Sequence, residues 1–228
     1  MPPAPSRFRG LRGLRVLFRD RVDAGLRLAE VLREYLGPGS VVYGIARGGV
    51  VVAGVVARRL GCALDVIVVK KIGVPFNPEL AAAAVTEFGD LAVEDEVVDF
   101  YGISRETIMK KAADQVPAMR GRAESYRSGR GFIDAAGKTV AVIDDGLATG
   151  TTMLAAVQSI KKMRPSKLIA SAPVASTAAA SRLRPFVDQF VCPYIEEEFY
   201  AVGEFYENFA QVTDAEVIEY LRAGVNFC

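Results

Sequence analysis

The 228-residue chain contains no histidine. Without an imidazole, the chain cannot form a Ser-His-Asp or Cys-His catalytic group, or a zinc site with histidine ligands. Its three cysteines, Cys62, Cys192 and Cys228, are widely spaced and form no metal-binding motif. So few thiols are typical of a reducing compartment. Any catalysis must therefore depend on carboxylates, Lys, Arg, Tyr, backbone donors or a bound metal ion.

The chain also lacks a large net charge and a long hydrophobic run. Lys and Arg number 28 against 27 acidic residues, so no overall charge points to nucleic acid or to a membrane surface. No uncharged apolar run approaches the ~20 residues of a membrane span. Residues 1–21 carry six arginines and one acid but no apolar stretch typical of a secretory signal. We therefore expect a cytoplasmic protein that binds neither membranes nor nucleic acid.

Strand-like and helix-like apolar patterns alternate along most of the chain, which is the order of a parallel α/β protein. Strands are predicted at residues 41–45, 64–72, 140–143, 168–174 and 189–194, and helices at 22–36, 50–60, 153–163 and 176–183. A further helix is predicted from Ser104 to about Arg127, bent at Pro117, and a last one after the capping box of Thr213 and Glu216. At this length we expect one domain.

The segment from Val140 to Thr152 contains the clearest functional pattern. A short buried strand leads into Asp144 and Asp145, then into a glycine- and threonine-rich loop that opens a helix. Such a loop offers unpaired backbone N–H groups and the positive end of the helix dipole, which suits a phosphate dianion. The two carboxylates are better suited to sugar hydroxyls, or to Mg²⁺ held through water.

This segment closely resembles the 5-phosphoribosyl-1-diphosphate (PRPP) binding motif of type I phosphoribosyltransferases. The resemblance implies a doubly wound, mostly parallel α/β sheet, with a core at about residues 20–195 and a flexible lid loop at about 73–103. It also implies a small hood, formed by about residues 196–228 together with the N-terminal arm. The implied activity is Mg²⁺-dependent transfer of 5-phosphoribosyl from PRPP to a nitrogen nucleophile in nucleotide metabolism, with release of diphosphate, by a homodimer.

The resemblance also implies which residues bind PRPP. Asp144 and Asp145 would bind the ribose and hold Mg²⁺ through water, and the loop that follows would bind the 5-phosphate. A second loop after the strand at 41–45 and two lysines would bind the diphosphate, with Lys70 favoured over Lys71. Asp144, Asp145, Arg47 and Lys70 are the expected catalytic residues. The full expected PRPP set is Ala46, Arg47, Gly48, Gly49, Lys70, Lys71, Asp144, Asp145, Gly146, Ala148, Thr149, Gly150, Thr151 and Thr152.

The acceptor is less well defined by the sequence. The aromatic cluster Phe199, Tyr200, Phe205, Tyr206 and Phe209 is either a hydrophobic subcore or a surface that stacks on a flat heterocycle, with Phe199 and Tyr200 as candidate acceptor contacts. Relatives that act on hypoxanthine and guanine commonly carry Asp where this chain has Ala148. A nitrogen heterocycle other than a 6-oxopurine is therefore favoured.

Two other functions remain open. A PRPP-sensing regulator would share the fold, but it would need a basic face for nucleic acid, and only the arginines of residues 1–21 offer one. Interleaved Leu11, Leu14, Val16 and Leu17 predict instead that this segment packs on the protein. A Mg²⁺-dependent hydrolase would need further carboxylates near Asp144, and the sequence identifies none.

Overall fold

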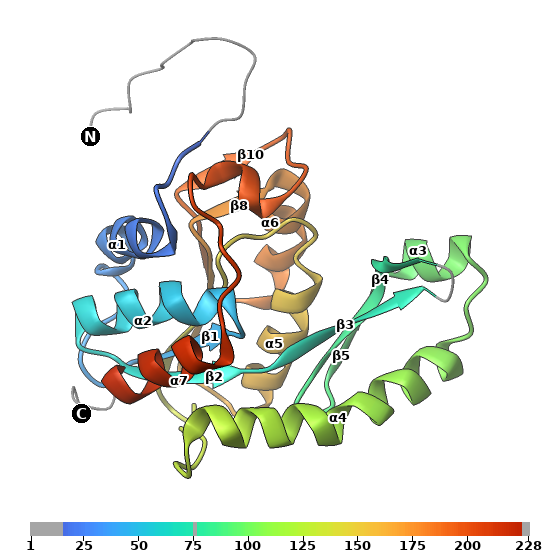
Figure 1. Ribbon diagram of the computed structural model, residues 1–228, viewed down its shortest axis with the longest axis horizontal. Coiled ribbons are helices and arrows are strands. Elements are labelled where there is room, and N and C mark those ends of the chain that lie inside the picture. The colour runs from blue at the N-terminus through green and yellow to red at the C-terminus, as the bar shows by residue number, and fades with distance from the viewer. Residues whose placement is uncertain (1–15, 75–76, 225–228) are drawn as a thin grey trace.

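The computed structural model describes residues 16–74 and 77–224. A five-stranded sheet with strand order β2-β1-β6-β7-β9 forms its centre (Figure 1). All four strand pairs in this sheet are parallel. Its strands are β1 Val41–Ile45, β2 Ala63–Ile67, β6 Thr139–Ile143, β7 Lys167–Ser171 and β9 Gln189–Val191. The predicted α/β class, with a mostly parallel sheet, is confirmed.

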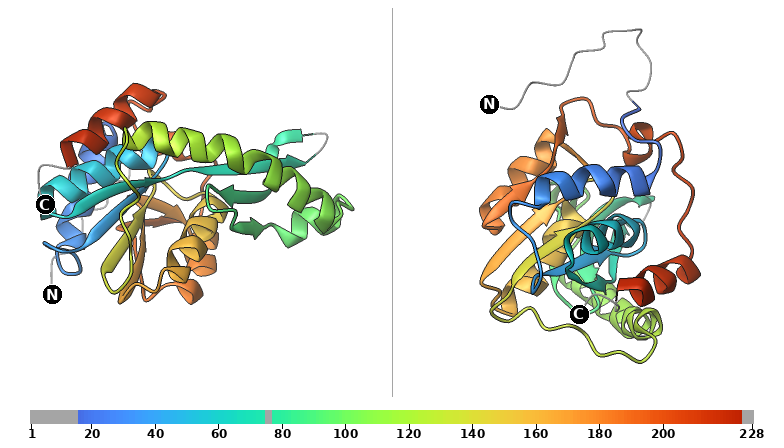
Figure 2. Two further views of the ribbon diagram at one scale, coloured as in Figure 1. Left: turned by 90° about the horizontal axis from the view of Figure 1, so that it is seen from below. Right: turned by 90° about the vertical axis from the view of Figure 1, so that its left-hand side faces the viewer.

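Helices cover both faces of this sheet, so the fold is doubly wound. On one face lie α1 Arg21–Leu32, α2 Gly48–Leu60 and α7 Asp214–Ala223, and on the other α5 Thr151–Lys162 and α6 Thr177–Leu183 (Figure 2). Alternate residues of the central strands enter two separate cores: Val42 and Ile143 face α2, whereas Tyr43 and Val142 face α5. The chain leaves β1 and β6 toward opposite faces, which makes their adjacent carboxyl ends the switch point where such sheets bind ligands.

The predicted capping residues begin two helices: Ser104 caps α4 Arg105–Arg127, and Thr213 and Glu216 form the capping box of α7. Ser176, predicted as the first residue of a helix, is the N-cap of α6. The first helix ends at Leu32, four residues before the predicted end at 36. None of the helices in the described ranges combines the length and the apolar character needed to cross a membrane.

The predicted strand at 64–72 is wrong, because two strands with different partners share this stretch. Residues up to Ile67 form β2 of the parallel sheet, whereas β3 Val69–Val74 pairs antiparallel with β4 Asn77–Thr86, which pairs with β5 Leu91–Val93. Lys70 and Lys71 therefore lie inside a strand and not at a strand end. Similarly, the predicted strands at 168–174 and 189–194 each break near a proline, and β8 Val174–Ser176 and β10 Tyr194–Glu196 form a separate parallel pair.

Residues 73–103 are more regular than the predicted loop. The three antiparallel strands form an arm that projects from the sheet and continues into α3 Asp95–Phe100 and α4 Arg105–Arg127 (Figure 1). The run of alanines in β4 has no alternation of polar and apolar residues that would identify a strand. Their small side chains pack between α4 and α5. Pro117 lies within α4, which changes direction along its length (Figure 1).

The N-terminal segment and the chain after β10 pack together. Leu17 and Phe18 donate backbone hydrogen bonds to the carbonyl of Phe205, both at 2.9 Å, and Glu207 donates back to Phe18 at 2.8 Å. Phe18, Phe205 and Tyr206 form a small buried cluster of their own, against which Leu17 packs. The expected packing of the N-terminal segment therefore holds for Leu17 and not for Val16, which is exposed. Leu11 and Leu14 lie outside the described residues.

Candidate active site

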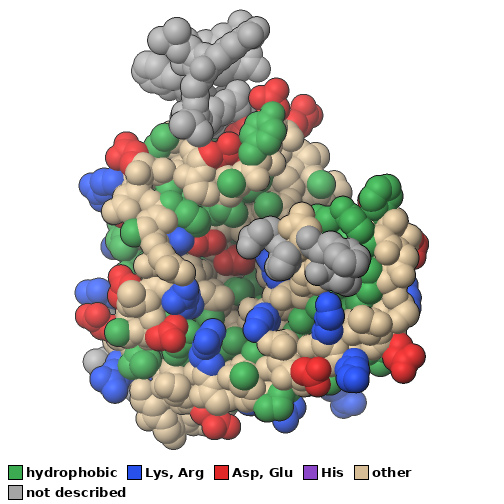
Figure 3. Space-filling model, turned by 45° about the vertical axis from the view of Figure 1, so that its right-hand side comes forward, with side chains coloured by type: hydrophobic (Ala, Val, Ile, Leu, Met, Phe, Trp, Pro, Cys, Tyr) green, Lys and Arg blue, Asp and Glu red, His purple; other side chains and the backbone are tan. Residues whose placement is uncertain are grey.

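The carboxyl ends of β1 and β6 are adjacent, with Gly44 opposite Ile143 in the parallel register. This pairing brings the loop after β1 beside Asp144 and Asp145. In the space-filling view, a hollow lies between the body of the protein and the arm, with acidic side chains at its floor and Lys and Arg side chains around it (Figure 3). The two predicted loops thus meet at one end of the sheet.

Two glycines allow the β1 loop to lie directly against the aspartates. A Cβ on Gly49 would be 2.7 Å from the carbonyl oxygen of Ile143 and 2.9 Å from Asp144 Cα. A Cβ on Gly48 would overlap the Asp145 carboxylate and lie 2.8 Å from Arg21 Nε. Real Cβ atoms do not approach backbone atoms as closely as one on Gly49 would, so the packing requires glycine at that position. At Gly48 the close contacts are with the ends of two side chains, which would have to shift to admit a Cβ. The preceding Ala46–Arg47 peptide bond is cis.

The two aspartates have different surroundings. Asp145 Oδ2 accepts a hydrogen bond from Arg21 Nε at 2.7 Å, and the Asp145 carbonyl accepts one from the Tyr206 hydroxyl at 2.5 Å. Asp144 Oδ1 accepts only the backbone N–H of Asp145, at 2.9 Å, among the contacts of the described chain. Burial, and then the charge of Asp145, raise the pKa of Asp144 well above its ordinary value, and Lys71 opposes this shift.

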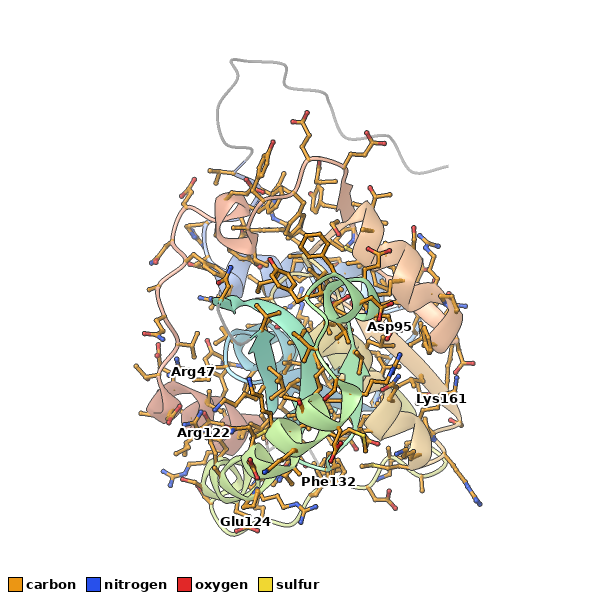
Figure 4. The ribbon with its side chains drawn as sticks, turned by 90° about the vertical axis from the view of Figure 1, so that its right-hand side faces the viewer. Arg47, Asp95, Arg122, Glu124, Phe132 and Lys161 are labelled. Atoms are coloured by element: carbon orange, nitrogen blue, oxygen red, sulfur yellow. The ribbon has the colours of Figure 1, made fainter. Side chains whose placement is uncertain are left out.

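Lys70 and Lys71 face opposite sides of β3, because successive residues of a strand alternate. Lys71 is close enough to act on the charge of Asp144, whereas Lys70 Nζ donates to Gln115 Oε1 of α4 at 2.5 Å. The Arg47 side chain also points away from the aspartates of the site. Its Nη1 lies 3.6 Å from Asp214 Oδ1 at the start of α7, and Figure 4 shows Arg47 on the side of that helix. The roles predicted for Arg47 and Lys70 therefore need a rearrangement of both side chains, and they stay predictions.

The loop between β6 and α5 is held in place by β8. The N–H of Leu147 donates to the Val174 carbonyl at 3.0 Å, and the Ser176 hydroxyl donates to the Ala148 carbonyl at 2.5 Å. Gly150 begins α5 at a φ of +78°, a left-handed conformation that favours glycine. Gly150, the N-cap residue, has no side chain to cap this helix, and the Thr149 hydroxyl accepts the N–H of Thr151 at 3.5 Å. The other N–H groups of the first turn are available to an anion.

Two residues that the sequence did not identify lie at this loop. The Thr151 hydroxyl donates to Glu94 Oε1, and Arg182 Nη1 donates to both oxygens of Glu94, at 2.5 and 2.6 Å. A third, Arg21, pairs with Asp145. All three belong to segments with no recognisable motif, and the contacts join residues 57 to 124 positions apart. No local sequence pattern could have predicted them.

The comparison with protein families decides what this site belongs to. The model described as phosphoribosyl transferase domain matches residues 21–206. The chain belongs to the phosphoribosyl transferase family. The matched range includes both loops, Arg21, Glu94 and Arg182, so the whole site described above lies in the family domain.

Individual relatives agree with this assignment. Two curated proteins from two strains of Mycobacterium tuberculosis, whose names assign them provisionally to the phosphoribosyl transferases, are each 39% identical over 212 residues, or 92% of this chain. The chain spans 48% of their length. The crystal structure of TT1426 from Thermus thermophilus is 40% identical, with a TM-score of 0.74 over 90% of this chain and 98% of that one. The AQ2163 protein of Aquifex aeolicus, at 14% identity and a TM-score of 0.51 over 80% of this chain and 76% of that one, shares the fold.

The aromatic cluster of this family member divides into buried and exposed rings. Phe205 and Tyr206 are buried beside Phe18, and Phe199 packs on Phe205 with ring centres 4.8 Å apart. Tyr200 is 86% exposed. The ring of Phe209, which was not among the favoured acceptor contacts, lies 3.9 Å from the guanidinium of Arg21, the residue that pairs with Asp145. The predicted acceptor contacts Phe199 and Tyr200 stay predictions.

The two carboxylates of the site suit a Mg²⁺ ion that is also bound by water and substrate. They are too few to hold a metal ion by protein ligands alone. Among the described residues, no three Asp, Glu or Cys side chains gather as a metal-binding group. Mg²⁺ commonly keeps several waters and binds one or two carboxylates together with substrate phosphates. Asp144 and Asp145 fit this kind of site, in which the substrate completes the coordination.

Proposed function

We propose that this protein transfers the 5-phosphoribosyl group of PRPP to a nitrogen nucleophile and releases diphosphate. The observation that carries the proposal is the arrangement of Asp144 and Asp145 between the glycine-started N-terminus of α5 and the Gly48-Gly49 loop. This arrangement offers a phosphate site, hydroxyl acceptors and a second set of backbone donors, in the order in which PRPP carries its 5-phosphate, ribose and diphosphate.

The proposed reaction breaks the bond between the anomeric carbon and the diphosphate oxygen, and the electron pair leaves on that oxygen. A bond from the acceptor nitrogen to the same carbon forms, and the acceptor loses a proton. Positive charge develops on the ribose, and Asp144 and Asp145 are placed to stabilise it while they accept hydrogen bonds from the ribose hydroxyls. Asp145 can do so through Oδ1, because Arg21 occupies Oδ2.

Negative charge develops on the departing diphosphate. Lys71 and the backbone N–H groups after β1 would bind it, with Arg47 once that side chain leaves Asp214. Mg²⁺, held through water by Asp144 and Asp145, would neutralise part of this charge. The 5-phosphate on the loop from Gly146 to Thr152 supplies binding energy far from the reacting bond and so positions the anomeric carbon.

For the acceptor we propose a nitrogen heterocycle, with 6-oxopurines disfavoured. Ala148 has a methyl group at the position where relatives that act on hypoxanthine and guanine commonly carry Asp, whose carboxylate helps to handle the proton of the purine N7. A homodimer in the cytoplasm is the expected form of the protein. Its alternative role, sensing PRPP without catalysis, would use the same loops.

The decisive experiment is to measure diphosphate release from PRPP, with and without Mg²⁺, against adenine, hypoxanthine, guanine, xanthine, uracil, orotate and simple amines. We expect Mg²⁺-dependent release with one acceptor class, and little with hypoxanthine or guanine. Tight PRPP binding by calorimetry without release would favour the sensor. No PRPP binding at all would contradict both.

Replacing Gly48 with alanine tests whether the β1 loop must lie against Asp145. The new Cβ would overlap the Asp145 carboxylate, which Arg21 holds in place, so the ion pair must shift. We expect diphosphate release to fall about 10- to 100-fold, because small displacements of catalytic groups cost rates of this order.

The matched control is Gly121→Ala, at an exposed position of α4 where a Cβ would meet no atom within 4 Å. This change should leave activity unaltered and raise stability by up to about 1 kcal/mol, because alanine favours the helix. Equal activities of the two variants would show that the close approach at Gly48 has no functional role.

A further inference from the structure

The phosphate loop already holds an anion that belongs to the chain itself. Glu94 lies between β5 and α3, and its carboxylate accepts a hydrogen bond from the hydroxyl of Thr151 at the start of α5. The Thr151 hydroxyl is in turn 2.8 Å from that of Thr149. Glu94 thus occupies the hydroxyl donor that the loop would offer to a phosphate.

Arg182 completes this internal anion site. It lies on α6, which packs against the loop, since a Cβ on Gly150 would be 3.3 Å from Ala179 and from Leu183. Its Nη1 reaches both oxygens of Glu94, and its Nη2 donates to the Val93 carbonyl at 3.1 Å. In Figure 4, Asp95 marks the start of α3 on the side of α6. Both side chains of the pair are shielded, with exposed fractions of 25% for Arg182 and 19% for Glu94.

A carboxylate and a phosphate compete for the same partners. Both accept hydrogen bonds from hydroxyls, from the N–H groups of a helix N-terminus and, in a bidentate manner, from a guanidinium. A phosphate on this loop cannot share Thr151 with an ionised Glu94 without like-charge repulsion in a poorly solvated site. Once Glu94 leaves, Arg182 loses its contacts with both carboxylate oxygens, and its guanidinium can bind a phosphate instead.

We propose that Arg182 is a further ligand of the 5-phosphate of PRPP, and that Glu94 holds its place until that phosphate displaces it. The inference rests on the proposed function, because it assumes that a ribose 5-phosphate group binds this loop. Binding exchanges one anion for another at Arg182 and Thr151, and it breaks the contacts of Glu94, at the junction of β5 and α3, with the body of the protein. The arm is therefore held to the phosphate loop in the free protein by the contact that the substrate breaks.

The experiment measures binding of ribose 5-phosphate and of PRPP by calorimetry to the wild-type chain, Glu94→Gln and Arg182→Gln. Removal of the competing charge should tighten binding of both ligands about 3- to 10-fold in Glu94→Gln. Loss of one charge-assisted contact should weaken it about 10-fold or more in Arg182→Gln. Arg182→Lys should recover only part of the loss, because a lysine cannot bind two oxygens in a bidentate manner.

Two neighbouring residues provide matched controls. Asp95→Asn removes the same charge one position along, from an exposed pair with Arg105, and Arg184→Gln removes an exposed arginine of the same segment as Arg182. Both should bind the two ligands as the wild-type chain does. Thermal unfolding of every variant shows that the fold is retained.

The outcomes separate the inference from the function on which it rests. If the wild-type chain binds ribose 5-phosphate and the Glu94 and Arg182 variants do not differ from their controls, the inference is wrong and the proposed function stands. Weaker binding in Glu94→Gln would also overturn it, because Glu94 would then support the phosphate site. If no variant binds either ligand, both fall. The expected pattern without any diphosphate release supports the inference and contradicts the transferase.

Discussion

Replacing both Asp144 and Asp145 with asparagine is expected to reduce diphosphate release at least about 1,000-fold while the fold is retained. Removal of a single group that stabilises transition-state charge typically costs about 100- to 1,000-fold, and here two adjacent carboxyl groups are lost. The amides keep the shape of the carboxylates but cannot balance positive charge on the ribose or hold Mg²⁺ through water. The measurement is single-turnover diphosphate release with the acceptor found in the panel.

The same change should not destabilise the protein greatly. Burial and the neighbouring carboxylate raise the pKa of Asp144, so its ionised form is disfavoured in the folded chain relative to the unfolded one. This group therefore costs stability as the pH rises through its raised pKa, and its neutral replacement removes that cost. The loss of the Arg21–Asp145 ion pair acts in the opposite direction. We expect an unfolding temperature within a few degrees of that of the wild-type chain.

A control with the same number of charges removed is Asp99→Asn with Asp114→Asn, because both side chains are exposed on the helices of the arm. This variant should react at the wild-type rate. Undiminished diphosphate release from the Asp144 and Asp145 variant would falsify the proposed site.

Replacing Arg127 with methionine is expected to cost about 3–5 kcal/mol of stability, which is the usual effect of removing one partner from a buried ion pair. Arg127 Nε lies 2.9 Å from Asp65 Oδ1, and its two Nη atoms lie 3.0 Å from the two oxygens of Glu87. Nη2 also donates to the Val66 carbonyl at 2.8 Å. All three side chains are buried. The change leaves two carboxylates without their cation where the arm, α4 and β2 join.

At about 2–4 °C per kcal/mol for a chain of this size, the unfolding temperature should fall by roughly 10 °C. The exposed Arg122 on the same helix is the control, and Arg122→Met should unfold within a degree or two of the wild-type chain. Adding Glu87→Gln to Arg127→Met should recover part of the loss, because one of the two stranded charges is gone. An Arg127 variant as stable as the control would show that this network contributes nothing net.

The variant also has an expected pH dependence. Burial is the largest influence on Glu87 and raises its pKa even with Arg127 present. Arg127 opposes this effect, so the pKa of Glu87 should be higher still in the variant that lacks the cation. A raised folded pKa means that the stability of the protonated form is present below the unfolded pKa of about 4.3 and is lost as the pH rises through the folded value. The deficit of Arg127→Met should therefore be smaller at acidic than at neutral pH.

The parallel α/β core and the two loops of the site could be predicted from the sequence alone. These features depend on local rules: buried strands appear as short apolar runs, glycine permits close backbone approach, and Ser104 and Thr213 cap their helices. The motif from Val140 to Thr152 spans only one strand, one loop and one helix start, so its geometry follows from neighbours in the chain. The same holds for Gly48 and Gly49 after β1.

The arm and the partners of the charged residues could not be predicted from the sequence, because they depend on contacts between distant segments. No glycine or proline separates β2 from β3, and only pairing with different strands ends one and begins the next. Glu94, Arg182 and Arg21 are ordinary surface charges by sequence, and they reach the site because distant segments fold over it. Their contacts depend on charge and distance in space, for which the order of residues along the chain provides no signal.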